Sequence, residues 1–423
     1  MKETGRLIRE LESGEHDKRL RELYADAEKA RRRYCRAAGE YERLFGGGEA
    51  ELYSAPGRTE VSGNHTDHQQ GMVLAAAVNL DALAVAGYNE ENRIRVVSEG
   101  YGMIDIDARD LGKKDGEAET SAAIVRGVAF GLREKGYRVG GFNAYITSDV
   151  LIGAGLSSSA AFEVLVGTVI SGLFNDMEIE PLTIAKTGQY AENVFFEKPC
   201  GLMDQTACAV GGLVFIDFEQ PKAPVVKKLP VDFKDFNYSL CIADTKGSHD
   251  NLTADYAALR SEMEDVAKFF GEKALRKVDE ALFYKSIPAL RERLGDRPVL
   301  RAIHFFNEEK RVERQAEALT RGDFNAFLQM VGESGSSSFQ YLQNVYTARN
   351  PKKQEVSIGL AVSGSILGKN GVARVHGGGF AGSVLAFVKN GFVERYRAAM
   401  DGVFGEGASQ VLQVRNEGGI RVL

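Results

Sequence analysis

The irregular order of strand and helix signals constrains the fold of this chain more than any other feature of its sequence. From about residue 50, short apolar runs typical of strands are separated by Gly-rich turns and helical patterns. Strands are predicted at 72–78, 82–86, 94–97, 141–146, 212–218, 238–244, 372–375, 383–388 and 410–414. Helices are predicted at 122–134, about 157–170, 182–196, 251–270, 279–294, 299–319, 323–332 and 391–403. Because these elements do not alternate regularly, the pattern favours an α+β fold over a doubly wound parallel sheet.

The first 45 residues differ from the rest in carrying many charges of both signs and no Pro. Their apolar residues recur at helical spacing, in one stripe at Leu20, Leu23, Tyr24 and Ala27 and another at Tyr34, Ala38 and Tyr41. We predict one or two amphipathic helices here, which pack against the rest of the chain or face solvent. They end at Gly46-Gly47-Gly48.

A cluster of prolines interrupts the pattern near the middle of the chain. Pro221, Pro224 and Pro230 follow the predicted strand at 212–218, and prolines close together are typical of a boundary. We therefore predict an N-terminal helical extension (1–46) followed by two domains (47–228 and 229–423). A chain of 423 residues has the length for two domains of ordinary size.

Composition and charge argue against several classes of protein. The chain has 53 Lys+Arg against 59 Asp+Glu, a net charge of −6, which disfavours nucleic acid as a partner. Cys35, Cys200, Cys208 and Cys241 form no C-x-x-C pair, so neither a zinc site nor a disulfide framework is expected. Reduced thiols are typical of a cytoplasmic protein, and we expect that location.

No membrane segment or secretory signal is expected. The most apolar stretch, Met72–Ala86, is interrupted by Asn79 and Asp81 and is too short to span a bilayer. Charged residues break the start of the chain, and no apolar signal core follows them.

A first polar cluster runs from Pro56 to Gly71. It places Arg58, Asn64, His65, Asp67 and His68 within eleven residues, which is dense for a surface turn. Carboxylate, amide and imidazole groups together recognise hydroxyl-rich ligands: the carboxylate accepts hydrogen bonds, and the amide and imidazole groups can donate as well as accept. A sugar or another polar ligand is therefore the favoured interpretation. A metal site from the two histidines and Asp67, and a plain solvated loop, are the alternatives.

A second cluster, Gly153 to Ser159, leads directly into a predicted helix. Its sequence is Gly-Ala-Gly-Leu-Ser-Ser-Ser. Glycines permit close backbone approach and a helix N-terminus presents free N–H groups, so this segment is suited to hold an anion such as phosphate. It is not a Walker A loop, because no Gly-Lys-Ser/Thr follows. A helix cap without a ligand is the structural alternative.

A third cluster, Arg374 to Val384, contains Gly377-Gly378-Gly379 and formally matches G-x-G-x-x-G-x-V. A dinucleotide-binding site would need a helix after the glycines, but residues 383–388 are predicted as a strand. A protein-kinase glycine loop would need its lysine and catalytic loop downstream, and about forty residues remain. The cluster therefore predicts a turn at which backbone approaches a ligand.

Two acidic residues stand between these clusters. Glu192 lies on a predicted helix, and Asp204 lies among apolar neighbours in Cys200-Gly201-Leu202-Met203-Asp204-Gln205. By themselves they are compatible with a helix cap or an ion pair as well as with catalysis.

The three clusters, in this order, resemble the three motifs of the GHMP kinases, and most closely those of the galactokinase branch. The resemblance includes Pro56–Arg58, Gly63–Asp67, Gly153–Ala160, Ala191–Asn193, Cys200–Gln205, His376–Gly382 and, more loosely, Asp244–Tyr256. It extends from about residue 40 to the C-terminus. The first thirty or so residues are longer than the family usually shows.

The resemblance implies a ribosomal-S5-domain-2-like N-terminal domain, a ferredoxin-like C-terminal domain and a ligand cleft between them. It also implies ATP-dependent phosphorylation of the anomeric hydroxyl of galactose to galactose 1-phosphate, with Mg²⁺ as cofactor. The partners are then a small-molecule sugar and ATP, and we expect a monomer.

The resemblance also assigns roles to individual residues. Asp204 matches the catalytic base and Arg58 the neighbouring arginine, whose charge would keep Asp204 ionised and offset charge on the phosphoryl group. The ATP phosphates would lie on the loop formed by Gly153, Ala154, Gly155, Leu156, Ser157, Ser158 and Ser159. Ser159 and Glu192 match the Mg²⁺ ligands. The sugar-contacting positions are Asn64, His65, Thr66, Asp67 and Tyr256, and the glycine-rich third motif is Gly377, Gly378 and Gly379.

The sequence departs from the family pattern at four places. The family has Glu at the place of Asn64, commonly Tyr at that of His68 and usually Thr at that of His376. Its Ser-Cys-Pro-Glu-Leu-Asp segment is absent; residues 346–351 stand nearby instead. None of these changes touches Asp204 or Arg58. Those at Asn64 and His68 fall in the sugar site, so they put the identity of the sugar in doubt more than the type of reaction. Galacturonate is the alternative substrate, and a sugar- and ATP-binding sensor without catalysis is the alternative class.

Overall fold

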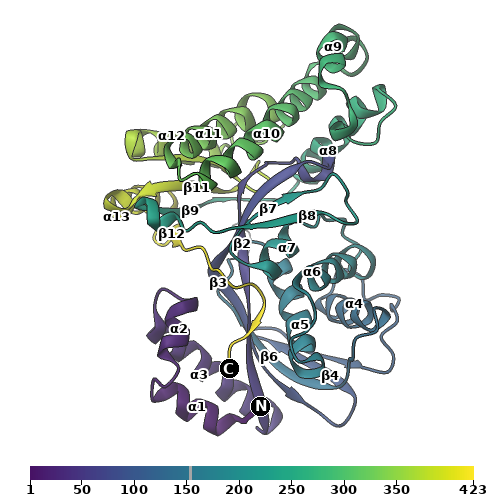
Figure 1. Cartoon of the computed structure of the whole chain (residues 1–423), viewed down its shortest axis with the longest axis vertical. Helices are drawn as coiled ribbons and strands as arrows, with labels where there is room; N and C mark the ends of the chain where they lie inside the picture. The colour runs from purple at the N-terminus through teal and green to yellow at the C-terminus, as the bar shows by residue number, and fades with distance from the viewer. Residues whose placement is uncertain (152–154) are drawn as a thin grey trace.

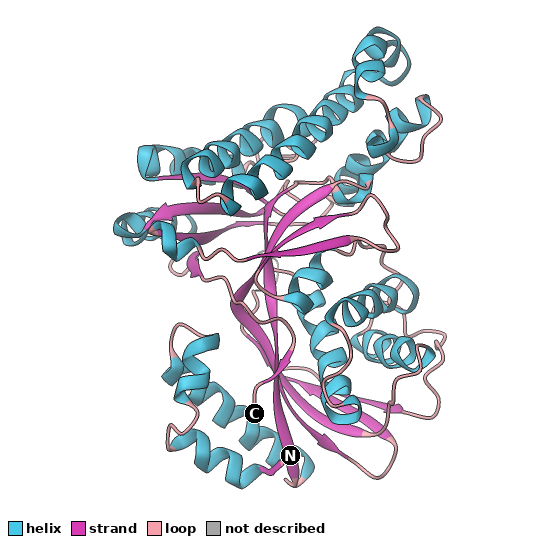
Figure 2. Ribbon diagram, viewed as in Figure 1, coloured by secondary structure: helices cyan, strands magenta, loops and turns pink. Residues whose placement is uncertain are grey.

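The computed structural model describes residues 1–151 and 155–423. Within that part of the chain the strands belong to two sheets, and helices pack around them (Figures 1 and 2). The strands are β1 (Lys2–Glu3), β2 (Glu49–Ser62), β3 (Met72–Tyr88), β4 (Arg93–Ser98), β5 (Met103–Asp107), β6 (Phe142–Ser148), β7 (Leu213–Asp217), β8 (Val225–Leu229), β9 (Tyr238–Gly247), β10 (Gly371–His376), β11 (Gly382–Lys389), β12 (Ser409–Leu412) and β13 (Ile420–Arg421). The helices are α1 (Thr4–Glu12), α2 (Asp17–Leu23), α3 (Ala27–Phe45), α4 (Ser121–Glu134), α5 (Ser158–Asn175), α6 (Pro181–Tyr190), α7 (Met203–Val210), α8 (Thr253–Phe269), α9 (Glu280–Leu294), α10 (Asp296–Thr320), α11 (Phe324–Ser337), α12 (Glu355–Leu367) and α13 (Val393–Phe404).

The larger sheet is built around the long strands β2 and β3, which pair antiparallel over most of their length. Its main strand order is β1-β2-β3-β6-β4-β5. The first part of β3 pairs with β7 and the second part with β6, so the two strands extend from the lower to the upper part of the molecule in Figure 1. The link between β2 and β3 carries most of the first polar cluster.

Strand β3 is buried on both faces, which explains its nearly continuous apolar sequence. Leu83 and Val85 pack into a cluster with the N-terminal helices. Ala82, Ala84 and Ala86, which point to the opposite face, pack into the main core with α5. Figure 1 shows α1–α3 on one side of this sheet and α4–α6 on the other. The N-terminal extension is therefore a packing layer, in three helices rather than the one or two predicted.

A buried ion cluster at Asp81 ties the extension to the sheet. Asp81 is fully buried and accepts hydrogen bonds from Arg33 of α3, Arg415 near the C-terminus and the hydroxyls of Ser54 and Tyr24. The two arginines hold the pKa of Asp81 below its usual range despite its burial. Because Asp81 is satisfied in this way, the strands predicted at 72–78 and 82–86 form one continuous strand.

The second sheet has the order β10-β11-β9-β12, with α12 and α13 packed against it. Its residues and those of the first sheet share one hydrophobic core, which includes Val214 of β7 and Phe387 of β11. The last strand, β13, returns to pair with β2 in the first sheet. The fold is a mixed α+β architecture, as predicted, whereas the domain limits at 46 and 228 stay a prediction.

By length and composition alone, α5 is the one helix in the described residues apolar enough to cross a membrane. The helix lies inside the fold, with 72% of the apolar window buried, and such core helices pass the same test in globular proteins. The four cysteines, all within the described residues, are free.

Candidate active site

The fold brings the three sequence clusters together although the first and the third lie more than 300 residues apart. The first cluster occupies the end of β2 and the link to β3, the second leads into α5, and the third is the turn between β10 and β11. His376, the last residue of β10, accepts hydrogen bonds on Nε2 from the Thr59 hydroxyl at 3.0 Å and the Glu60 N–H at 3.2 Å. A Cβ atom at Gly155 would lie 2.8 Å from Nδ1 of the same His376, so all three clusters meet at this histidine.

Arg58 and Asp204 form a two-pronged ion pair at the centre of this region. Arg58 Nε donates to Asp204 Oδ1 and Nη2 to Oδ2, both at 2.8 Å. Arg58 extends from β2 and is buried, whereas Asp204, in the first turn of α7, keeps 31% of its side chain exposed. A planar guanidinium that binds both oxygens of a carboxylate in this way fixes the orientation of the carboxylate. The exposed part of the Asp204 side chain leaves the carboxylate accessible to a ligand.

The described part of the second cluster lies directly against this pair. The Ser157 hydroxyl donates to Asp204 Oδ2, and the Gly155 carbonyl accepts from Arg58 Nη1. Ser157 has φ +56°, a left-handed conformation that is uncommon outside glycine and often marks functional segments. Gly153 and Ala154, also predicted to bind ATP, lie outside the described residues. The side chain of Leu156 is buried and packs in the main core, and its backbone carbonyl accepts from the Arg58 N–H at 3.0 Å.

Ser158 and Ser159 form the first turn of α5, where backbone N–H groups are free to bind an anion. Ser159 is exposed. The second predicted Mg²⁺ ligand, Glu192, lies in a π-helical turn (Ala191–Phe195) and is almost fully buried. Such turns are frequent at functional sites.

Buried polar groups surround Glu192. Its Oε1 accepts from Lys198 Nζ at 3.1 Å, and its Oε2 accepts from Gln205 Nε2 at 3.2 Å. Gln205 also donates to Glu163 Oε2 at 2.9 Å. Burial and the charge of Glu192 raise the pKa of Glu163 to about 9. Oε1 of Glu163 and Oε1 of Gln205 are buried without a hydrogen-bond partner.

This donor set suits a divalent cation that prefers oxygen. Mg²⁺ is held in proteins by one or two carboxylates, hydroxyls and water together with phosphate oxygens. Glu192 would supply the carboxylate, and the unpartnered oxygens of Glu163 and Gln205 beside it would be satisfied by the ion or its waters. The residues therefore fit the predicted Mg²⁺ site in chemistry.

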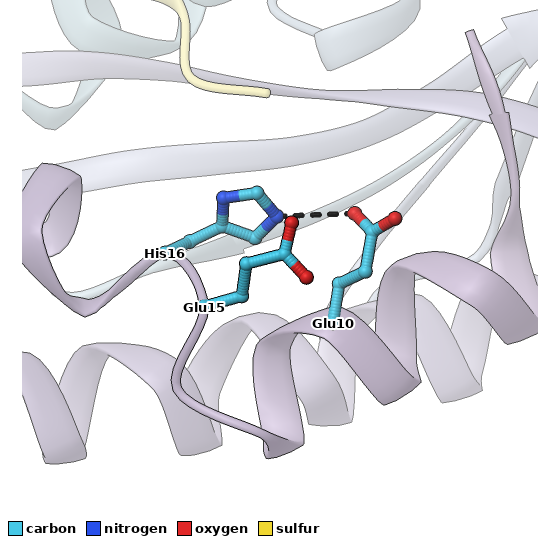
Figure 3. A group of neighbouring side chains, drawn as sticks. All are labelled: Glu10, Glu15 and His16. Carbon is cyan, nitrogen blue, oxygen red and sulfur yellow. Dashed lines mark hydrogen bonds and ion pairs between the residues drawn. The ribbon is translucent and has the colours of Figure 1, made fainter.

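His65, Asp67 and His68, the alternative metal site of the first cluster, are not among the described side chains whose ligand atoms lie close enough together to hold an ion. Among the described residues, the group with metal-compatible distances is Glu10, Glu15 and His16, at the end of α1 (Figure 3). There Glu10 already accepts from Lys2, Arg6 and His16, which lower its pKa to about 2. Two cations beside one carboxylate disfavour a further positive ion.

Of the predicted sugar contacts, Asp67 lies near the segment of Asp204, and His65 and Tyr256 contact the third motif. Asp67 begins a 3₁₀ turn and reaches the backbone before α7: a Cβ atom at Gly201 would lie 2.5 Å from Asp67 Oδ2. Burial raises the pKa of Asp67. His65 donates from Nε2 to the Gly378 carbonyl at 3.0 Å, and the Tyr256 hydroxyl donates to the Gly379 carbonyl at 2.8 Å.

Two other predicted sugar contacts are turned inward. Thr66 is fully buried, and its hydroxyl lies 2.9 Å from the Gly63 carbonyl and 2.6 Å from the Met72 carbonyl. Asn64 is also fully buried and bonded on every side by protein groups. This placement differs from the expectation of a direct sugar contact. Thr66 is bonded to backbone within and next to its own loop, whereas three of the four partners of the Asn64 side chain come from distant segments.

Sequence reasoning missed Glu163, Gln205 and Asn344. Glu163 did carry a signal, since it is a lone acid in the apolar run of α5. Gln205 follows Asp204 directly, but nothing marks Asn344, which lies in a loop and meets the third motif only in the fold.

Comparisons with known proteins agree with this geometry. Residues 39–88 match the model of the galactokinase galactose-binding signature, and residues 123–212 match that of the GHMP kinases N terminal domain. The fold is similar to that of Lactococcus lactis galactokinase complexed with galactose, with a TM-score of 0.76 and 24% identity over 90% of this chain and 98% of that one. A mevalonate kinase is also similar, with a TM-score of 0.59 and 15% identity over 86% of this chain and 99% of that one.

Two relatives are similar over nearly their whole length. A galactokinase of Streptomyces coelicolor is 30% identical over 369 residues, which are 86% of this chain and 91% of that protein. A galactokinase of Glaesserella parasuis is 33% identical over 363 residues, which are 85% of this chain and 90% of that protein. With this similarity, and with the three motifs assembled in one site, the chain belongs to the galactokinase family of the GHMP kinases.

Proposed function

We propose that this protein transfers the γ-phosphoryl group of ATP to the anomeric hydroxyl of galactose, producing galactose 1-phosphate and ADP. The observation that carries the proposal is the Arg58–Asp204 pair, held against the loop that opens α5. A proton acceptor next to an anion-binding helix N-terminus is what phosphoryl transfer to a hydroxyl requires. The galactokinase relatives support galactose as the acceptor.

Asp204 acts as the general base in this mechanism. It accepts the proton of the C1 hydroxyl as the sugar oxygen forms its bond to the γ-phosphorus and the bond to the ADP oxygen breaks. Arg58 holds Asp204 in a fixed orientation, and its positive charge offsets the charge on the phosphoryl group. The Ser157 hydroxyl donates to Oδ2 of the same carboxylate.

The loop before α5 and the first turn of the helix hold the ATP phosphates. Free N–H groups at the start of an 18-residue helix attract negative charge, and the hydroxyls of Ser158 and Ser159 add donors. Ser159 and Glu192 would hold Mg²⁺, which when bound neutralises phosphate charge. Asp67, His65 and Tyr256 orient the sugar, since together they both donate to and accept from hydroxyls.

A sugar panel tests the function directly. The protein is incubated with ATP, Mg²⁺ and galactose, galacturonate, glucose or N-acetylgalactosamine, while ADP release and the ³¹P spectrum are followed. We expect ADP release with galactose and a phosphate signal coupled to the anomeric proton. Turnover with galacturonate but not galactose would assign the other substrate, and galactose binding without ADP release would favour a sensor. We expect the protein to work in the cytoplasm as a monomer, without nucleic acid or membrane.

A further inference from the structure

The carbonyl groups of the third motif are held by residues from the proposed sugar site. Asn64 Nδ2 donates to the Gly377 carbonyl at 2.7 Å. The next two carbonyls, of Gly378 and Gly379, accept from His65 at 3.0 Å and Tyr256 at 2.8 Å. Three consecutive carbonyls of one turn thus each accept a hydrogen bond from a residue of the proposed sugar site, so the position of the turn is coupled to those of His65 and Tyr256.

The glycines of this turn allow the close approach. Gly379 has φ +80°, and a Cβ atom there would lie 2.0 Å from the Asn344 carbonyl oxygen. A Cβ atom at Gly378 would lie 2.8 Å from Tyr256 Cε1. The turn is therefore packed tightly on the tyrosine side, and its position is set by its hydrogen bonds rather than by side chains of its own.

Asn64 has no hydrogen-bonding capacity left for a ligand. Its Nδ2 donates to Glu60 Oε1 at 3.0 Å and to the Gly377 carbonyl. Its Oδ1 accepts from Ser338 Oγ at 3.2 Å and Asn344 Nδ2 at 2.8 Å. A primary amide offers two N–H groups and two acceptor positions, and all are used here. A sugar hydroxyl would have to displace one of these buried bonds.

The partners of Asn64 also explain why an amide stands at this position. Glu60 is buried and accepts from Arg374 Nη2 at 2.9 Å as well as from Asn64. A glutamate at position 64, as in the family pattern, would bring a second carboxylate against Glu60 and against the Gly377 carbonyl oxygen. Like charges in a buried site are costly, and a glutamate would have no N–H group to donate to Glu60 or to the Gly377 carbonyl.

We propose that Asn64 is a positioning residue rather than a sugar ligand. Its N–H group holds the Gly377 carbonyl in place. The turn at Gly377–Gly379 then holds His65 and Tyr256 where they bind the sugar. This inference rests on the proposed function, because it concerns the same sugar site. It predicts that disturbing Asn64 weakens sugar binding while phosphoryl transfer and ATP binding are largely preserved.

The double variant Glu60→Gln/Asn64→Asp removes the N–H group that serves the Gly377 carbonyl. It also takes the charge of Glu60 away from Arg374, so its kinetics are compared with those of Glu60→Gln alone. The new amide at position 60 can donate to the new carboxylate at position 64, so the contact between the two side chains is kept with its polarity reversed and the buried charge is unchanged. The carboxylate at position 64 has no N–H group for the Gly377 carbonyl, but it retains oxygen acceptors that a sugar hydroxyl could use. Ser338→Ala is the matched control, because Ser338 touches only the Oδ1 side of Asn64.

Steady-state kinetics distinguish positioning from direct contact. For the double variant we expect the KM for galactose to rise about tenfold, the worth of one well-placed hydrogen bond. We expect kcat and the KM for ATP to change less than about threefold, and Ser338→Ala to leave the KM for galactose nearly unchanged. An unchanged KM for galactose in the double variant would overturn the proposal, as would an equal rise in the Ser338→Ala control.

A measurement on the wild-type protein does not depend on whether the variant folds. With ¹⁵N-labelled asparagine, the side-chain NH₂ of Asn64 is expected to exchange slowly with solvent and to keep its chemical shifts when galactose is added. Fast exchange, or a shift on titration, would refute the positioning role. If the wild type phosphorylates no sugar, the proposed function fails, but slow exchange of this NH₂ still tests the contact to Gly377.

Discussion

Replacing Asp204 by Asn tests the assignment of the base most directly. The substitution keeps the shape of the side chain but removes the charge and the ability to take a proton. Loss of a general base typically lowers the rate by about 10²–10⁴-fold, or roughly 3–5 kcal/mol in activation free energy. We therefore expect kcat to fall within that range, while the dissociation constants for ATP and galactose change little.

The effect on stability can be worked from the contacts of Asp204. Three donors now serve its two oxygens: Arg58 Nε, Arg58 Nη2 and the Ser157 hydroxyl. An asparagine amide can still accept from Arg58 Nε and can donate to the Ser157 hydroxyl, but Arg58 Nη2 then faces an N–H group. One unpaired donor costs about 1–3 kcal/mol, and the lower end applies because Asp204 is partly exposed. The variant should therefore remain folded.

Ser157→Ala is the matched control for this experiment. It removes one hydrogen bond from the same carboxylate but leaves the proton acceptor, so kcat should stay within about tenfold of wild type. Initial rates of ADP formation with saturating substrates, together with thermal unfolding of each variant, give the comparison. If folded Asp204→Asn retained kcat within tenfold of wild type, Asp204 would not be the base.

Three further predictions follow from other parts of the structure. Glu192→Gln should raise the Mg²⁺ concentration for half-maximal rate more than Ser159→Ala does, because it removes charge as well as a ligand; equal titrations for wild type and both variants would contradict the site. Arg33→Met should lower the free energy of unfolding by about 3 kcal/mol, because it leaves buried Asp81 with one cation fewer, while kcat is unchanged; an unchanged urea midpoint would argue against this anchor. Burial lowers the pKa of His304 to about 4, below its ordinary 6.5, so the folded state resists its protonation. Unfolding free energy should fall by up to about 3 kcal/mol as pH drops from 6.5 to 4, and His304→Gln should flatten that slope in urea titrations; an equal slope in both proteins would refute the assignment.

The sequence by itself determined those features that depend on local chemistry. Gly-rich turns beside polar residues marked the three motifs. Their resemblance to a known family pointed to Arg58 and Asp204, which form an ion pair in the structure although they lie 146 positions apart. The α+β class followed from the order of strand and helix patterns, because the spacing of apolar residues along the chain distinguishes a strand from a helix. The turn after His376 was likewise predictable, because a strand pattern follows its glycines.

Tertiary structure alone decided which polar side chains face a ligand and which are buried. Asn64 lies in a motif rich in sugar-binding residue types, but Asn344, Ser338 and Gly377, each more than 270 positions away, use up its hydrogen bonds. Asp81 separates the two strands predicted at 72–78 and 82–86. In the fold it is buried within one continuous strand, because Arg33 and Arg415, from opposite ends of the chain, pair with it. The physical reason is the same in both cases: the cost of burying a polar group depends on partners that the fold brings from distant segments.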